Sequence, residues 1–102
     1  MKTTQKPNAI VTGAARGIGL ASVRIMAEAG LRVGCLDIDA DAAEAAASRL
    51  RYDGLDVEAL AADVSDRQSV EAAFSAFLGD APLYALVNNA VFIRFQPFGE
   101  VT

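Results

Sequence analysis

The chain alternates short apolar runs with longer segments whose apolar residues recur at helical spacing. Four runs are nearly continuous in apolar residues, which is typical of strands covered on both faces, and they occupy 8–12, 32–37, 57–62 and 83–88. Three segments of helical period follow the first three runs, over 17–29, 40–51 and 65–78. Strands that alternate with helices in this way predict a parallel sheet with right-handed crossovers.

Residues that begin or end helices stand at the boundaries of these segments. Gly30 is placed to stop the first helix, and either Asp39 or Asp41 to cap the second. Ser65 and Gln68 have the spacing of a capping box, which predicts that the third helix starts at Ser65. The segment 79–82, with a glycine and a proline, ends that helix before the fourth strand.

These elements predict an α/β fold in which the strand order is 3-2-1-4. On that order the first two helices cover one face of the sheet, and the third helix covers the other face. The fourth strand would then form an exposed apolar edge, which a complete protein normally pairs or covers. We therefore expect the chain to be truncated relative to a complete fold.

A glycine-rich run, Thr-Gly-Ala-Ala-Arg-Gly-Ile-Gly, joins the first strand to the first helix at positions 12–19. Glycines at 13, 17 and 19 allow a sharp turn, close approach of a ligand and tight packing of the helix on the strand. The first turn of a helix has unpaired N–H groups and a partial positive charge, so a pyrophosphate fits against residues 17–19. The alternative is a glycine-rich turn with no ligand.

Asp37 ends the second strand, eighteen positions after Gly19. A carboxylate at this place can accept hydrogen bonds from the ribose hydroxyls of a dinucleotide. The alternative is an ordinary aspartate at the end of a strand.

Composition narrows the class of protein. The 102 residues suffice for one domain, 1–102, and a net charge of −4, with both lysines (Lys2 and Lys6) in the leading tail, argues against a nucleic-acid partner. The absence of histidine and the single cysteine, Cys35, exclude zinc sites and Ser/His or Cys/His nucleophile pairs. We expect no membrane segment and no metal, and a cytoplasmic location, with Cys35 as a small buried hydrophobe.

Four pieces of the sequence together resemble the short-chain dehydrogenase/reductase family over essentially the whole length of the chain. They are the glycine run, the aspartate at the end of the second strand, the pair Asp63-Val64 after the third strand, and Asn-Asn-Ala at 88–90 after the fourth. The resemblance implies the cofactor-binding half of a Rossmann-type three-layer sandwich with a seven-stranded parallel sheet. It also implies an NAD(P)-dependent oxidoreductase acting on an alcohol or ketone, and a homo-oligomer in the full-length form.

The resemblance also assigns roles to individual residues. In the family the glycine run holds the cofactor pyrophosphate, the aspartate after the third strand holds the adenine amino group, and the asparagine run steadies the glycine turn and lines the cofactor site. With the ribose acceptor, the expected cofactor-binding residues are Gly13, Arg16, Gly17, Ile18, Gly19, Asp37, Asp63, Val64, Asn89 and Ala90.

The charges near the ribose favour NAD over NADP. Asp37 would repel a 2′-phosphate and accept hydrogen bonds from a 2′-hydroxyl. Arg16, just before the second glycine, is a residue type that the family uses to accept NADP, so NADP is the second choice.

Two departures from the family pattern stand out. Val91 occupies the place where the asparagine run usually ends in glycine. The family's catalytic Tyr-x-x-x-Lys pair does not occur in these residues, because the fourth positions after Tyr52 and Tyr84 are Asp56 and Asn88. We therefore assign no catalytic residue, and we expect this chain alone to be inactive.

The phenylalanines of the segment 91–102 could border a substrate pocket, or could pack under parts outside this sequence. Two other functional readings stay open. The chain could be a nucleotide-binding module without catalysis, or, less well supported by the intact glycine run, a structural remnant without a ligand.

Overall fold

Four parallel strands form one sheet in the order β3-β2-β1-β4, as the sequence predicts. The computed structural model describes residues 6–89. The strands are β1 (Asn8–Thr12), β2 (Arg32–Asp37), β3 (Val57–Ala61) and β4 (Leu83–Asn88). The third strand ends one residue earlier than the sequence predicts.

The register brings the carboxyl ends of the strands to one edge of the sheet. Thr12, at the end of β1, lies opposite both Leu36 on β2 and Asn88 on β4. Asp37, at the end of β2, lies opposite Ala61 on β3. The turns that follow the strands therefore start side by side, which is the place where open parallel sheets bind ligands.

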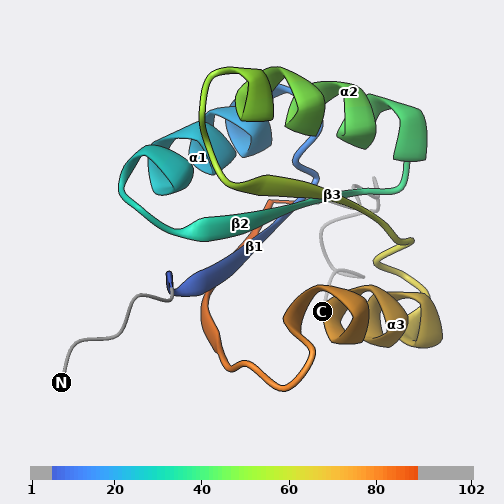
Figure 1. The fold of residues 1–102 in the computed structure, drawn as a ribbon. Helices are drawn as coiled ribbons and strands as arrows, with labels where there is room; N and C mark the ends of the chain where they lie inside the picture. Colours follow the sequence, from blue (N-terminus) through green and yellow to red (C-terminus); the bar gives the residue numbers. More distant parts are fainter. Residues whose placement is uncertain (1–5, 90–102) are drawn as a thin grey trace, which may run out of the picture.

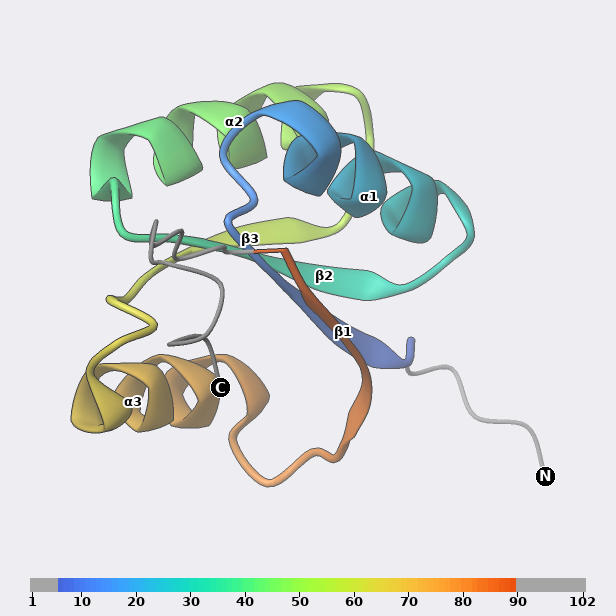
Figure 2. The ribbon, with the colours of Figure 1, turned by 180° about the vertical axis from the view of Figure 1, so that it is seen from behind.

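Three helices complete a three-layer α/β sandwich. The helices α1 (Gly17–Glu28) and α2 (Ala40–Tyr52) lie on one face of the sheet, and α3 (Arg67–Leu78) lies on the other (Figures 1 and 2). The first helix ends one residue earlier than predicted, with Ala29 as its C-cap, and the second ends one residue later. This arrangement is a Rossmann-type fold, and its layers agree with the sequence prediction.

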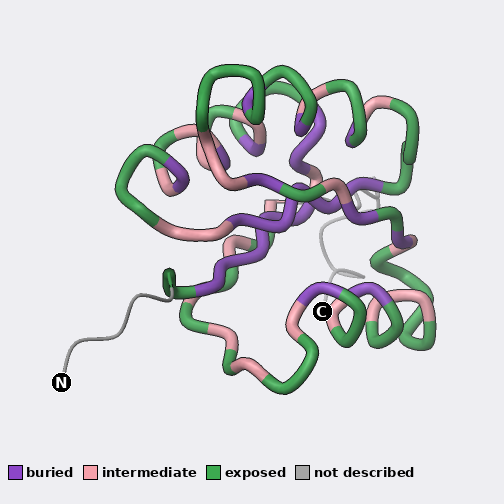
Figure 3. Tube along the Cα trace, viewed as in Figure 1, coloured by how far each residue is buried: buried purple, intermediate pink, exposed green. Residues whose placement is uncertain are grey.

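Alternation along the strands divides the core into two clusters. On β1, Val11 packs into the cluster under α1 and α2, and its neighbour Ile10 packs into the cluster under α3. On β2, Cys35 and Leu36 divide between the two clusters in the same way. Figure 3 shows the buried residues concentrated along the strands and on the sheet-facing sides of the helices. Burial on both faces explains why β1 is a nearly continuous apolar run.

Aspartates cap the second and third helices. Asp39 caps α2 by accepting a hydrogen bond from the backbone N–H of Ala42, which decides between the two predicted caps. The predicted start of the third helix at Ser65 is wrong, because Asp66 is the N-cap of α3 and accepts from the N–H groups of the second and third helical residues. Ser65 instead donates its N–H and its hydroxyl to Asp63, which holds it in the preceding turn.

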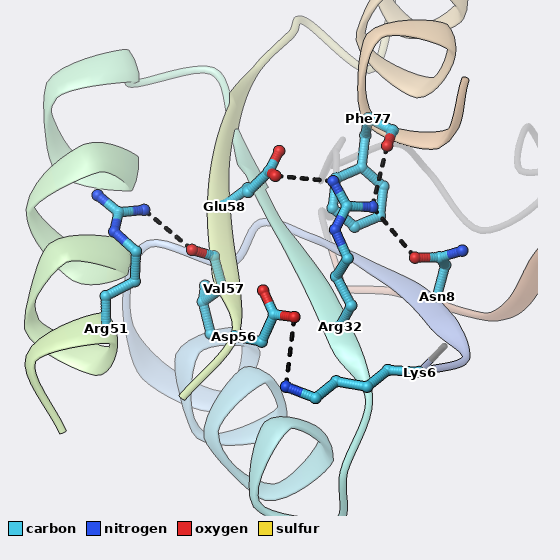
Figure 4. Close-up of polar contacts among 8 residues, drawn as sticks. All are labelled: Lys6, Asn8, Arg32, Arg51, Asp56, Val57, Glu58 and Phe77. Atoms are coloured by element: carbon cyan, nitrogen blue, oxygen red, sulfur yellow. Dashed lines mark hydrogen bonds and ion pairs between the residues drawn. The ribbon is translucent and has the colours of Figure 1, made fainter. Parts of the chain in front are cut away.

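Arg32 joins three strands and a helix at the amino-terminal end of the sheet (Figure 4). Its guanidinium donates to Asn8 Oδ1 at 3.1 Å, to the backbone oxygen of Phe77 at 3.0 Å and to Glu58 at 2.7 Å. It also lies 4.0 Å from the centre of the Phe77 ring. This residue therefore connects β1, β2, β3 and α3 at the edge opposite the ligand-binding end.

The edge strand β4 exposes apolar side chains. Its residues alternate between half-buried and exposed, and the side chains of Tyr84 and Leu86 are 73% and 50% exposed. The sequence predicts this exposed edge.

Candidate functional site

A pocket of about 310 Å³ lies at the carboxyl end of the sheet. Segments that follow all four strands line it, with the residues Gly13, Leu36, Asp37, Ile38, Ala62, Asp63, Val64 and Asn89. Five predicted site residues therefore meet here, namely Gly13, Asp37, Asp63, Val64 and Asn89. Arg16, the N-cap of α1, and residues 17–19, which begin that helix, do not line this pocket. Ala90 and Val91 lie outside the described residues.

The glycine turn reaches the start of α1 through backbone that favours glycine. Gly13 and Gly17 have φ angles of 62° and 63°, in the left-handed region. Among residues 6–89, no side chain accepts a hydrogen bond from the first turn of α1, and that turn has no acidic residue. The amino terminus of this helix can therefore receive an anion.

Gly19 allows α1 to lie directly against the turn. A Cβ atom at this position would overlap the backbone oxygen of Gly13 and would lie 2.8 Å from Asn89 Nδ2. Asn89 Nδ2 also donates to the Gly13 oxygen at 3.3 Å. The third glycine is therefore needed for packing, and Asn89 supports the turn as the sequence predicts from the family resemblance.

Thr12 links the end of β1 to the end of the edge strand β4. Its hydroxyl donates to Asn88 Oδ1 at 2.9 Å, and the N–H of Asn89 donates to the same hydroxyl at 3.0 Å. This pair of bonds fixes the asparagine segment beside the glycine turn. This role of Thr12 is not predicted from the sequence, because a threonine at the end of a strand gives no separate signal.

The carboxylate of Asp37 is buried, 9% exposed, and both of its oxygens accept backbone hydrogen bonds. The N–H of Ala15 donates to Oδ2 at 3.0 Å, and the N–H of Asp39 donates to Oδ1 at 3.1 Å. A carboxylate oxygen has two lone-pair sites, so each oxygen can accept one further hydrogen bond. Asp37 thus supports the glycine turn and can still bind a hydroxyl from the pocket.

The end of β2 holds the glycine turn at two further points. The N–H of Ala14 donates to the backbone oxygen of Leu36 at 3.1 Å, and the Cys35 thiol donates to the backbone oxygen of Ala14 at 3.4 Å. Burial, with a smaller contribution from the charge of Asp37, raises the pKa of the Cys35 thiol to about 11. Cys35 is therefore a neutral core residue, as its place in an apolar run predicts.

Arg16 and Asp39 form an ion pair beside Asp37. Arg16 is the N-cap of α1, and its guanidinium lies 3.5 Å from Asp39 Oδ2. The N–H of Ala42, and then the charge and hydrogen bond of Arg16, hold the pKa of Asp39 below its usual range. Asp39 is thus a carboxylate at neutral pH.

Asp63 presents an ionised oxygen on the β3 side of the pocket. Its Oδ1 accepts from the hydroxyl and the N–H of Ser65, at 2.7 and 2.9 Å, and these bonds hold the pKa of Asp63 below its usual range. Within residues 6–89, no hydrogen bond or ion pair reaches its Oδ2. That oxygen can accept a hydrogen bond from an amino group.

Two apolar side chains are exposed where they line the pocket. Ile38 is 69% exposed and Val64 is 47% exposed, and they follow β2 and β3 respectively. Exposed apolar residues at a pocket can mark the place of a flat apolar ligand. Ile38 is not among the residues predicted from the sequence, where its one signal is its place between two aspartates at the end of a strand.

Within the part of the chain that the structure describes, no group of three His, Cys, Asp or Glu side chains is placed to hold a metal ion. No helix in residues 6–89 combines the length and the apolar character needed to cross a bilayer.

Comparison with known proteins places this arrangement in a family. A family model described as short chain dehydrogenase matches residues 7–102. The chain therefore belongs to the short-chain dehydrogenase family of oxidoreductases, a family that binds nicotinamide dinucleotides. This result confirms the resemblance found in the sequence.

Two bacterial relatives illustrate the similarity. A D-threitol dehydrogenase of Mycolicibacterium smegmatis is 39% identical over 95 residues, which cover 92% of this chain and 36% of that protein. A 1-deoxy-11-beta-hydroxypentalenate dehydrogenase of Streptomyces avermitilis is 44% identical over 89 residues, which cover 84% of this chain and 32% of that protein.

Solved structures share the fold. A gluconate 5-dehydrogenase from Burkholderia cenocepacia, in complex with NADP and tartrate, has a TM-score of 0.81 and 32% identity, and the match covers 96% of this chain and 39% of that one. A hydroxysteroid dehydrogenase from Escherichia coli has a TM-score of 0.77 and 34% identity, with coverage of 86% and 38%. The chain thus spans about a third of the length of the proteins it matches.

Proposed function

We propose that the protein is an oxidoreductase that transfers a hydride between NAD(H) and an alcohol or ketone, and that residues 1–102 supply its cofactor-binding domain. One observation carries the proposal. The uncapped amino terminus of α1 follows a turn with two left-handed glycines, and that turn lines the same pocket as the buried carboxylate of Asp37. This combination suits the phosphate and ribose of a dinucleotide.

The pyrophosphate would bind at the start of α1. Its oxygens would accept hydrogen bonds from the backbone of Gly17, Ile18 and Gly19, because no side chain within residues 6–89 caps this turn. The positive end of the helix dipole would add favourable electrostatics. Ile18 is 77% exposed, so a ligand can reach the backbone at its position.

The adenosine would occupy the pocket. Asp37 would accept hydrogen bonds from the ribose hydroxyls, and Asp63 Oδ2 would accept one from the adenine amino group. The adenine ring would cover Ile38 and Val64, whose exposed apolar surfaces fit an aromatic ligand. Asn89 would steady the glycine turn and line the cofactor site.

Asp37 supports NAD as the preferred cofactor. It is buried and held by two backbone N–H groups, so it cannot swing away from a 2′-phosphate. A phosphate placed against a fixed buried carboxylate suffers like-charge repulsion of several kcal/mol. The gluconate 5-dehydrogenase of known structure is bound to NADP, and titration of this protein with both cofactors tests the preference.

The bound nicotinamide supplies the hydride chemistry, and this chain's residues bind and orient it. We assign no catalytic residue within 1–102. The names of the relatives, a threitol dehydrogenase and a gluconate 5-dehydrogenase, suggest a hydroxylated small molecule as substrate.

Calorimetric titration of the protein, expressed from its whole coding sequence, with NADH and NADPH tests the binding proposal. Gly13→Asp should abolish binding, because it adds a side chain and a negative charge to a left-handed position in the pocket lining. Gly54→Asp is a matched control, because Gly54 also has a positive φ, 88°, but lies in the turn between α2 and β3. Equal losses in both variants, or no saturable binding in the parent, would refute the proposal.

The alternative is a nucleotide-binding module without catalysis. Dinucleotide binding without turnover of polyols, secondary alcohols or the corresponding ketones would favour it. Cofactor-dependent turnover that Gly13→Asp abolishes would favour the oxidoreductase.

A further inference from the structure

The ion pair between Arg16 and Asp39 connects the amino termini of two helices beside Asp37, which lines the pocket. Each residue is the N-cap of its helix, α1 and α2 respectively, and 23 positions separate them. Both flank the buried Asp37, which holds the glycine turn through Ala15 and the start of the α2 turn through the N–H of Asp39. The charged side chains of Arg16, Asp37 and Asp39 therefore form one cluster.

Asp39 is the fixed member of the ion pair. Its Oδ1 accepts from the N–H of Ala42, and its own N–H donates to Asp37, so both its backbone and its side chain are held. The side chain of Arg16 is 70% exposed, and within residues 6–89 its one ion-pair partner is Asp39. Arg16 is therefore free to take another anion if Asp39 releases it.

We propose that Asp39 is a specificity-determining residue that holds Arg16 and thereby disfavours a dinucleotide with a phosphate on the adenosine ribose. The inference rests on the proposed function, because it concerns the cofactor that the pocket would take. Asp39 would then favour NAD together with Asp37, the one residue on which the preference for NAD rests in the sequence.

The balance of charge explains the effect. With Asp39 ionised, the cluster holds two carboxylates and one guanidinium, so a ribose phosphate meets a net negative charge. It must also compete with Asp39 for the Arg16 guanidinium. A 2′-hydroxyl carries no charge and does not compete with Asp39 for Arg16, so the ion pair leaves NAD binding unaffected.

Asp39→Asn separates charge from helix capping, since asparagine is as good an N-cap as aspartate. We expect the ratio of the NADPH and NADH dissociation constants to fall about fivefold in this variant, which is the size expected for an exposed ion pair. Calorimetric titrations with both cofactors at one ionic strength measure that ratio. Thermal unfolding checks that the variant stays folded.

Two further variants distinguish the ion pair from a general change of charge. Asp41→Asn removes the same charge from the first turn of the same helix, and Asp41 has no ion pair within the described residues. It should change the ratio by less than about twofold, since exposed charges are screened. Arg16→Gln combined with Asp39→Asn should restore the ratio of the parent protein, because the guanidinium that would meet the phosphate is gone.

The outcomes separate this inference from the proposed function. If neither cofactor binds the parent protein, both fail. If both cofactors bind but Asp39→Asn leaves the ratio unchanged, or Asp41→Asn shifts it equally, the role of Asp39 is refuted and the proposed function stands. A fall in the ratio that persists in the double variant without Arg16 would also refute the role of Asp39.

Discussion

The backbone N–H of Ala15, in the glycine turn, donates a buried hydrogen bond to the carboxylate of Asp37, 22 positions further along the chain, at 3.0 Å. The bond ties the turn after β1 to the end of β2. Asp37 therefore has a structural role in the protein without cofactor, in addition to the ribose contact proposed for it.

Asp37→Ala is expected to lower the free energy of unfolding by about 1–3 kcal/mol in the absence of any cofactor, because it leaves the buried N–H of Ala15 without an acceptor. Urea unfolding monitored by circular dichroism measures the change. Asp80→Ala, at an exposed position after α3, is the control and should change stability by less than about 0.5 kcal/mol. Equal stability of Asp37→Ala and the parent would show that the bond contributes nothing.

Gly19→Ala is expected to displace the glycine turn, because its Cβ would overlap the Gly13 oxygen and crowd Asn89. We expect a loss of about 1–3 kcal/mol of stability and a changed NMR signal for the Asn89 side-chain amide. Gly17→Ala is the comparison, because a Cβ there meets no atom within 4 Å. It should cost about 1–2 kcal/mol through its left-handed backbone alone and leave the Asn89 signal in place. An unshifted Asn89 signal in Gly19→Ala would contradict the packing argument.

Stability should fall with rising pH in the alkaline range because of Cys35. Its pKa is raised from 9.0 to about 11 in the folded protein, so between these values the unfolded chain loses a proton that the folded protein keeps. The stabilisation from the neutral buried thiol is complete below pH 9.0 and is lost as the pH rises to about 11. Cys35→Ala should show a shallower fall in melting temperature over this range. Parallel pH profiles of Cys35→Ala and the parent protein would contradict the prediction.

Arg32→Lys is expected to destabilise the protein by about 1–3 kcal/mol, because an ammonium cannot make the same set of planar hydrogen bonds to Asn8, Phe77 and Glu58. Arg67→Lys is the matched control, since Arg67 is 89% exposed and pairs only with Glu71 among the described residues. Chemical denaturation of both variants tests the difference. Dinucleotide affinity should stay unchanged in both, because Arg32 lies at the opposite end of the sheet.

Most of the fold could be predicted from the sequence, because the local signals agree with one another. The bounds of β1, β2 and β4 match the apolar runs to the residue, and the strand order follows from the alternation of strands with helices. The capping of α3 was not predicted correctly. Ser65 and Asp66 both suit an N-cap, and Asp63, which binds Ser65 in the preceding turn, settles the choice in favour of Asp66.

The sequence predicts which residues meet at the candidate site, but not the hydrogen bonds and ion pairs among them. Gly13, Asp37, Asp63, Val64 and Asn89 meet in one pocket because parallel strands bring their carboxyl ends to one edge. The ion pair of Arg16 with Asp39, the exposed Ile38 and the hydrogen bonds of Thr12 could not be read from spacing. They depend on how neighbouring turns face one another.

The periodicity, the glycine turn and the acidic residue at the end of β2 could be read from the sequence, since these are properties of short segments. Only the folded structure shows that Asp37 is buried with one backbone hydrogen bond on each oxygen, and that Gly19 lies against Gly13 and Asn89. The physical reason is that hydrogen-bond partners and close contacts between distant segments are fixed only when the sheet register is formed.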